Sequence, residues 1–77
     1  MDHTDLNATL GAVVTARLAA AGISQRAASR RTYIPSASLS GKLAGARQIT
    51  ATDLARLAAV LDTTATDLLR EAEVNAA

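Results

Sequence analysis

Apolar residues recur at three- and four-residue steps through the first part of this 77-residue chain, which is the spacing of a helix that buries one face. The residues of this stripe are Leu6, Leu10, Val13, Val14, Leu18 and Ala21. Gly22 follows the stripe, where a glycine can take the left-handed conformation that closes a helix, and Ile23 can pack back on the last turn. The sequence therefore predicts a first helix that starts near Thr4 or Asp5 and ends at Gly22.

Two short helices joined by a tight turn are predicted next. Ser24 is a suitable N-terminal cap for a second helix from about Gln25 to Arg31. Pro35 disfavours a helical conformation at the residue before it and suits the first turn of a helix after it. The third helix should run from about Ser36 to Ala44, with Gly45 closing it. The side chains expected to face inward are Ala27, Ala28, Thr32, Leu39 and Leu43.

Two more helices are predicted from a repeated start signal. Thr50 with Asp53 three residues later resembles a capping box, and Thr64 with Asp67 repeats the pattern. The residues of the fourth helix that are expected to face inward are Leu54, Leu57, Ala58 and Leu61, and the fifth helix carries Leu68 and Leu69. Residues 74–77 show too little pattern to assign.

Composition agrees with an all-α fold and limits what the chain can be. Phe and Trp are absent and Tyr33 is the only aromatic residue, so strands are not expected. A length of 77 residues predicts one domain, 1–77. Without cysteine there is no disulfide and no thiolate metal site, which favours the cytoplasm. The apolar run from Leu10 to Ile23 contains Arg17 and is too short to cross a bilayer, so no membrane partner is expected.

The charged residues are distributed unevenly along the chain. No acidic residue stands between Leu6 and Thr52, although six of the eight basic residues do. Those six are Arg17, Arg26, Arg30, Arg31, Lys42 and Arg47. A folded chain with this distribution should present one positive face, which is what binding to a polyanion requires.

The order of these elements resembles the Cro/phage-repressor (XRE-type) helix-turn-helix family. The resemblance runs from Ile23 to Leu69 and is carried by "ISQRAASRRTYIPSASLSGKLAG" and "ITATDLARLAAVLDTTATDLL". It implies an all-α, compact five-helix repressor-type domain with its motif at about residues 24–45. It also implies a double-stranded DNA-binding transcriptional regulator, most simply a phage-type repressor or Cro-like protein that occupies an operator.

The resemblance assigns DNA-binding roles by position. Gln25 matches the glutamine that holds a DNA phosphate at the start of the motif's first helix, and Arg47 and Gln48 fall in the loop that often adds a further contact. The outward residues of the recognition helix are Ser36, Ala37, Ser38 and Gly41, with Ser40 on its flank. The chain departs from the family pattern at Tyr33, where glycine is usual, at Ser29, where a small alanine is usual, and at Lys42, where an apolar residue is more common.

The recognition helix is expected to make few direct contacts to base edges. Between Ser36 and Ala44 there is no Arg, Asn or Gln, the side chains that can bond two atoms of one base edge. Specificity would then come from Arg47, Gln48 or the deformability of the DNA. Arg26, Arg30, Arg31 and Lys42 are the phosphate candidates. Adjacent helical residues diverge by about 100°, so Arg30 and Arg31 cannot both face the DNA backbone equally. Arg30 is included among the predicted DNA-binding residues, and which of the two arginines contacts phosphate stays open.

Other functions are less well supported. The only histidine, His3, has no cysteine or carboxylate cluster beside it, so an enzyme, a metal site, a cofactor or a small-molecule substrate is not indicated. The alternative is a helix-turn-helix protein-interaction module such as an antitoxin or antirepressor. A weak homodimer on DNA is weighed against a monomer, with Leu68, Leu69 and Val74 as the candidate interface, because adjacent leucines cannot both point fully into the core.

Overall fold

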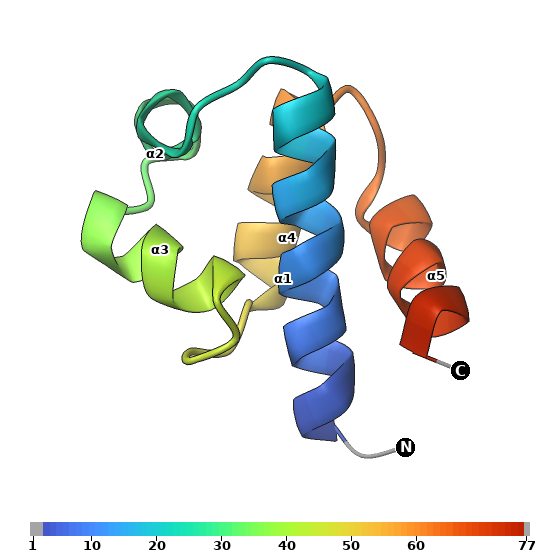
Figure 1. Ribbon diagram of the computed structural model, residues 1–77. Coiled ribbons are helices and arrows are strands. Elements are labelled where there is room, and N and C mark those ends of the chain that lie inside the picture. The colour runs from blue at the N-terminus through green and yellow to red at the C-terminus, as the bar shows by residue number, and fades with distance from the viewer. Residues whose placement is uncertain (1–2, 77) are drawn as a thin grey trace.

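The computed structural model describes the backbone of residues 3–76 and the side chains of residues 6–76, so the side chains of Asp2, His3 and Asp5 lie outside the described part. This part of the chain contains five helices and no strand (Figure 1). The helices are α1 (His3–Ala20), α2 (Gln25–Thr32), α3 (Ser36–Leu43), α4 (Ala51–Val60) and α5 (Ala65–Ala76). The all-α prediction is confirmed, and each helix begins within two residues of the predicted start.

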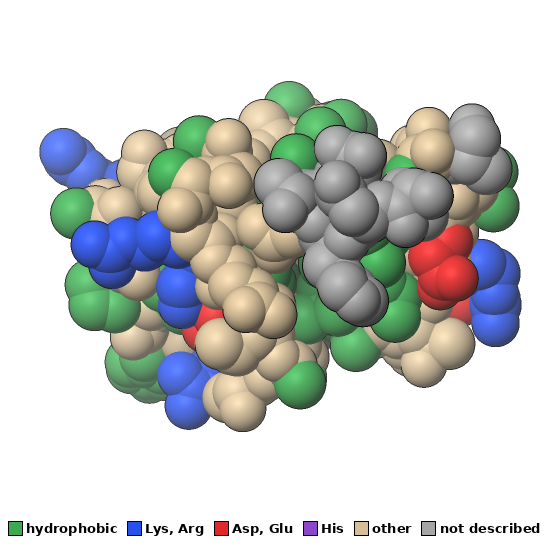
Figure 2. Space-filling model, turned by 90° about the horizontal axis from the view of Figure 1, so that it is seen from below, with side chains coloured by type: hydrophobic (Ala, Val, Ile, Leu, Met, Phe, Trp, Pro, Cys, Tyr) green, Lys and Arg blue, Asp and Glu red, His purple; other side chains and the backbone are tan. Residues whose placement is uncertain are grey.

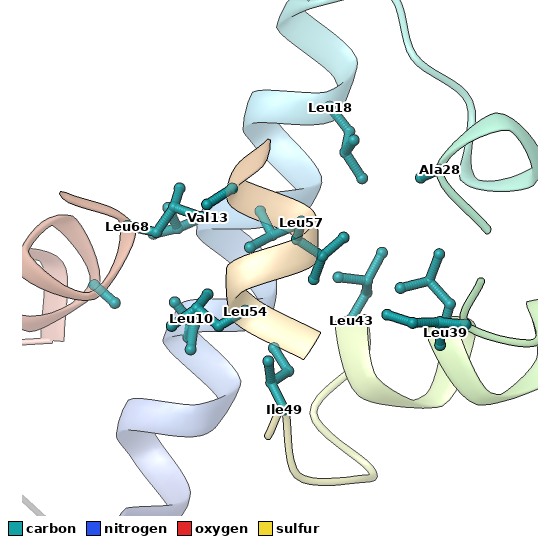
Figure 3. Close-up of a cluster of buried hydrophobic side chains, with 14 residues drawn as sticks. Leu10, Val13, Leu18, Ala28, Leu39, Leu43, Ile49, Leu54, Leu57 and Leu68 are labelled. Carbon is teal, nitrogen blue, oxygen red and sulfur yellow. The ribbon is translucent and has the colours of Figure 1, made fainter. Parts of the chain in front are cut away.

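The long helix α1 holds the fold together. It packs against α5 on one side and against α3 on the other, while α2 contacts both α3 and α4 (Figure 1). The buried apolar side chains of α1, α3, α4 and α5 meet between the helices, as Figure 3 shows. This core comprises Leu10, Val13, Val14, Leu18, Ala28, Ile34, Leu39, Leu43, Ile49, Leu54, Leu57, Ala58, Leu68 and Ala72. Most of the predicted stripe therefore lies inside, with Leu6 partly buried against the core and the last residue exposed.

The exception is Ala21, which is exposed because α1 ends one residue before it. Gly22 adopts φ +71°, and the Ile23 N–H donates to the Leu18 carbonyl at 2.9 Å. This pairing reaches back over the last turn and satisfies a carbonyl that the helix leaves free. Gly22 therefore ends α1 as predicted, but the turn rotates Ala21 outward.

The predicted caps of the last two helices form. Thr50 and Asp53 make a reciprocal capping box at α4, with the Asp53 N–H 3.1 Å from Thr50 Oγ1 and the Thr50 N–H 3.0 Å from Asp53 Oδ2. At α5 the Asp67 N–H donates to Thr64 Oγ1 at 3.0 Å. The helix α5 continues to Ala76, beyond the last residue that the pattern could assign. Ala72 of this helix is buried in the core.

No single helix of the described part is long and apolar enough to span a bilayer; one pair, Leu6–Ala20 with Gln25–Thr32, meets the length and composition criteria together but is bent by 105°.

Candidate nucleic-acid interface

The helices α2 and α3 are joined by a turn at residues 33–35, which makes the helix-turn-helix pair. Tyr33 stands where the resemblance described above predicts glycine, and it adopts the left-handed conformation with φ 62° and ψ 20°. Such a conformation is unfavourable for a residue that carries a Cβ. The side chain of Tyr33 is 86% exposed, so burial does not offset that cost.

Two hydroxyl groups hold this turn in place. Ser29 Oγ donates to the Ile34 carbonyl at 2.6 Å, and buried Thr32 Oγ1 accepts the Ile34 N–H at 3.3 Å. Ile34 itself is a core residue. Ser29 therefore helps to fix the start of α3 relative to α2.

The helix α3 divides into a buried face and an open face. Leu39 and Leu43 lie in the core, whereas Ser36, Ala37 and Ser40 are exposed. Ser38 and Gly41 are partly exposed. No side chain caps the N-terminus at Pro35, and the first backbone bond that closes the helix runs from the Leu39 N–H to the Pro35 carbonyl at 2.8 Å. The open face thus offers hydroxyl groups, one methyl group and the N–H groups of the first turn.

The loop after α3 folds back over that helix. Gly45 adopts φ +83°, and the N–H groups of Ala46 and Arg47 both donate to the Gly41 carbonyl, at 2.9 and 3.2 Å. The side chain of Arg47 lies across Gly41, since a Cβ built on Gly41 would be 3.4 Å from both Cγ and Cδ of Arg47. The loop arginine therefore packs beside the position that a Cβ on Gly41 would take.

A residue that the sequence did not single out fixes this loop from the other side. Asn7 of α1 donates from Nδ2 to the Arg47 carbonyl at 3.0 Å and accepts the Ile49 N–H on Oδ1 at 3.0 Å. No local pattern pointed to Asn7, because its partners are 40 and 42 residues away. Close packing of α1 on α3 brings them together: a Cβ on Gly11 would lie 2.5 Å from the Leu43 carbonyl oxygen.

Positive charge gathers on the same end of the molecule. In the described part, the three ion pairs involve Arg17, Lys42 and Arg70 as cations. The exposed arginines that take part in none of them are Arg26, Arg30, Arg31, Arg47 and Arg56, of which Arg56 donates to the Thr32 carbonyl at 3.4 Å. Figure 2 shows basic side chains over the end that carries α2 and α3, and acidic side chains with one basic group over α5 at the opposite end. The predicted charge asymmetry is therefore present in the fold.

Lys42 does not behave as the predicted phosphate contact. Its Nζ lies 2.6 Å from Asp53 Oδ2, and only 16% of the Lys42 side chain and 10% of the Asp53 side chain is exposed. Burial by itself raises the pKa of the Asp53 carboxyl, but the hydrogen bonds from Lys42 and Thr50 outweigh burial and leave this pKa below its usual value. The ammonium group ties α3 to the start of α4, which argues against a place for Lys42 on the DNA surface.

The two adjacent arginines of α2 separate as helix geometry requires. Arg31 lines a shallow cleft between α2 and α4 together with Tyr33, Arg56 and Val60. Arg30 is exposed and is not part of that cleft. Both arginines are exposed, and Arg31 is the one that borders the cleft.

The candidate dimer residues differ in accessibility. Leu68 is fully buried in the core, so it is not available for an interface, which corrects that part of the prediction. Leu69 is partly buried in a groove that also contains Leu6 and Ile49. Val74 is 69% exposed. The argument that the two leucines cannot both enter the core is confirmed.

Comparison with known proteins supports the fold. No protein-family model matches the chain, and no curated protein matches it. Among solved structures, the crystal structure of the clp gene regulator ClgR from Corynebacterium glutamicum is similar, with a TM-score of 0.87. The match covers 92% of this chain and 76% of that chain at 24% sequence identity. At this level of identity the likeness shows the fold alone.

Proposed function

We propose that this chain is a double-stranded DNA-binding transcriptional regulator. The observation that carries the proposal is the set of exposed arginines on α2 and in the loop after α3, which take part in no ion pair of the described residues. A cation with no protein partner remains free to neutralise a phosphate. The acidic side chains of α5 lie at the opposite end, where they would not repel the duplex (Figure 2).

The roles of the residues follow from their positions. Phosphate contacts are proposed for Gln25, Arg26 and Arg30, which are exposed on α2. Base-edge contacts are proposed for Arg47 and Gln48, because arginine can bond two atoms of guanine and glutamine two atoms of adenine. The residues proposed to line the major groove are Ser36, Ala37, Ser38, Ser40 and Gly41.

The finer proposal is a phage-type repressor or Cro-like protein that occupies an operator in the cytoplasm, with residues 1–77 as one DNA-binding domain. The resemblance of residues 23–69 to that family supports it. The name of the similar solved structure, a gene regulator, points in the same direction. Blocking an operator requires binding alone, and no reaction is proposed.

A weak homodimer on DNA is also proposed, through the exposed Val74 and the partly buried Leu69. Two chains related by a two-fold axis would read half-sites about 34–36 Å apart on one face of the duplex. Such pairing would add to the few contacts that one α3 helix with small side chains can make.

The alternative is a protein-interaction module, such as an antitoxin or antirepressor, on the same fold. The observation in its favour is the open face of α3, which has no side chain able to make two hydrogen bonds with one base.

Selection from a pool of random duplexes separates the two functions. A regulator should enrich one sequence family, and Arg47→Ala should relax the preference at one base pair within it. If the recovered duplexes show no enriched sequence, or if no duplex is recovered, sequence-specific DNA binding would be excluded. A partner protein retained by the chain in the absence of any duplex binding would favour the interaction module.

A further inference from the structure

We propose that Asn7 is a positioning residue for base recognition, which holds the Arg47 loop on α3 without touching DNA itself. This inference rests on the proposed DNA-binding function and adds a residue from α1 to it. Arg47, whose stem packs beside Gly41 of α3, would then supply the base contact, and Asn7 would set where its guanidinium group stands.

The side-chain amide of Asn7 makes a two-point attachment to the loop. Its Nδ2 donates to the Arg47 carbonyl and its Oδ1 accepts the Ile49 N–H, both at 3.0 Å. An amide can donate and accept at once, so it can pair with an extended backbone segment on both sides of a residue. That residue is Gln48, which is exposed between the two bonds. The attachment therefore fixes the backbone of both proposed base-contacting residues.

The other side of the loop is attached to α3 itself. The Gly41 carbonyl accepts two N–H groups of the loop, and the Cγ and Cδ methylene groups of Arg47 lie 3.4 Å from the position that a Cβ on Gly41 would occupy. The Nε atom of Arg47 is 3.7 Å from that position. The arginine stem thus rests on a bare segment of α3, and a side chain longer than a methyl group at position 41 would compete with it.

Attachment on both sides lowers the cost of ordering Arg47 when DNA binds. A free arginine loses much of its rotamer freedom on forming a two-bond contact, and a stem that is already held loses less. Loss of the Asn7 attachment should therefore weaken the preferred site by about 2- to 12-fold, the cost of ordering one flexible side chain. Binding to a duplex that lacks the preferred base pair should change little.

A double-mutant cycle on the full chain tests this. Binding of the parent, Asn7→Ala, Arg47→Ala and the double variant is measured on the selected duplex and on one with the Arg47-dependent base pair replaced. The Asn7→Ala loss should appear on the selected duplex and vanish in the Arg47→Ala background. Glu71→Gln is the matched control, because it removes the negative charge from the 2.9 Å ion pair between Arg17 of α1 and Glu71 of α5 and leaves the loop untouched. This control should retain the parent's base preference.

A Gly41 variant keeps the proposal testable if Asn7→Ala folds poorly. Gly41→Met should displace the arginine stem, whose Cγ and Cδ lie 3.4 Å from the position of a Cβ on Gly41, and should lose the preference. This variant replaces a glycine inside a helix and should raise stability.

The proposal is overturned if Asn7→Ala weakens both duplexes equally, or if its loss persists in the Arg47→Ala background. It is also overturned if Gly41→Met retains the parent's preference. A parent that shows no preference between the duplexes would instead remove the proposed function.

Discussion

Replacing Lys42 with methionine separates a structural role from a DNA-binding role. The ammonium group lies 2.6 Å from the Asp53 carboxylate, with side-chain exposures of 16% and 10%. A hydrogen bond to a charged group contributes about 1.5–3 kcal/mol. Methionine keeps most of the stem, and Asp53 keeps its bond from the Thr50 N–H, so we expect a loss of roughly 1–2 kcal/mol of unfolding free energy at pH 7.

The loss should depend on pH in a direction set by Asp53. Its pKa in the folded protein is below the usual 3.8, because the hydrogen bonds from Lys42 and Thr50 outweigh burial, which acts in the opposite direction. A carboxyl with a lowered folded pKa stabilises the fold above its unfolded pKa and ceases to do so as the pH falls through the folded value. The difference in stability between the parent and Lys42→Met should therefore be full at pH 7 and shrink below about pH 4.

Urea denaturation followed by far-ultraviolet circular dichroism at pH 7 and pH 3 measures both effects. Arg26→Met is the matched control, because Arg26 is exposed on α2 and takes part in no ion pair of the described residues. This control should keep the parent's stability and bind DNA with a weaker salt dependence. The reasoning would be refuted if Lys42→Met were as stable as the parent at pH 7 and instead showed a weaker salt dependence of DNA binding, with the slope of log binding constant against log salt concentration reduced by about one unit.

Three further changes have expected outcomes. Tyr33→Gly should raise the unfolding free energy by about 0.5–1 kcal/mol in chemical denaturation, since glycine adopts φ 62° without strain; a less stable variant would mean that the tyrosine makes a stabilising contact. Gly11→Ala should lower it by roughly 1–3 kcal/mol, because the new methyl group would lie 2.5 Å from the Leu43 oxygen. A gain of about 1 kcal/mol, as helix propensity alone would give, would contradict that packing. Val74→Glu should fold normally and sediment on the selected duplex as one chain where the parent sediments as two; two chains in both cases would exclude Val74 from the interface.

The helix ends could be predicted because their signals are local. Gly22, Ser24 and the Thr50–Asp53 box each act within a few residues of the helix that they close or open. The buried face of α1 could also be predicted, because the helical spacing of its apolar residues identifies that face. These features depend only on residues that are close together in the sequence, so they can be predicted from the sequence alone.

The interface was less predictable because it depends on how helices rotate against one another. The charge of Lys42 indicated a phosphate contact, but the packing of α3 on α4 turns it toward Asp53. Asn7 and Gly11 carried no local signal, although one holds the Arg47 loop and the other allows α1 to approach α3. Their roles arise from contacts between residues more than 30 positions apart, which periodicity and capping rules do not address.

The salt dependence of binding to the selected duplex tests the central claim most directly. If Arg26 and Arg30 each neutralise one phosphate, the logarithm of the binding constant should fall against the logarithm of salt concentration with a slope of about −2 per domain. Arg26→Ala should reduce the steepness by about one unit on every sequence. A binding constant that does not change with salt, in a protein that remains folded throughout, would contradict the assignment of this arginine-rich end to DNA.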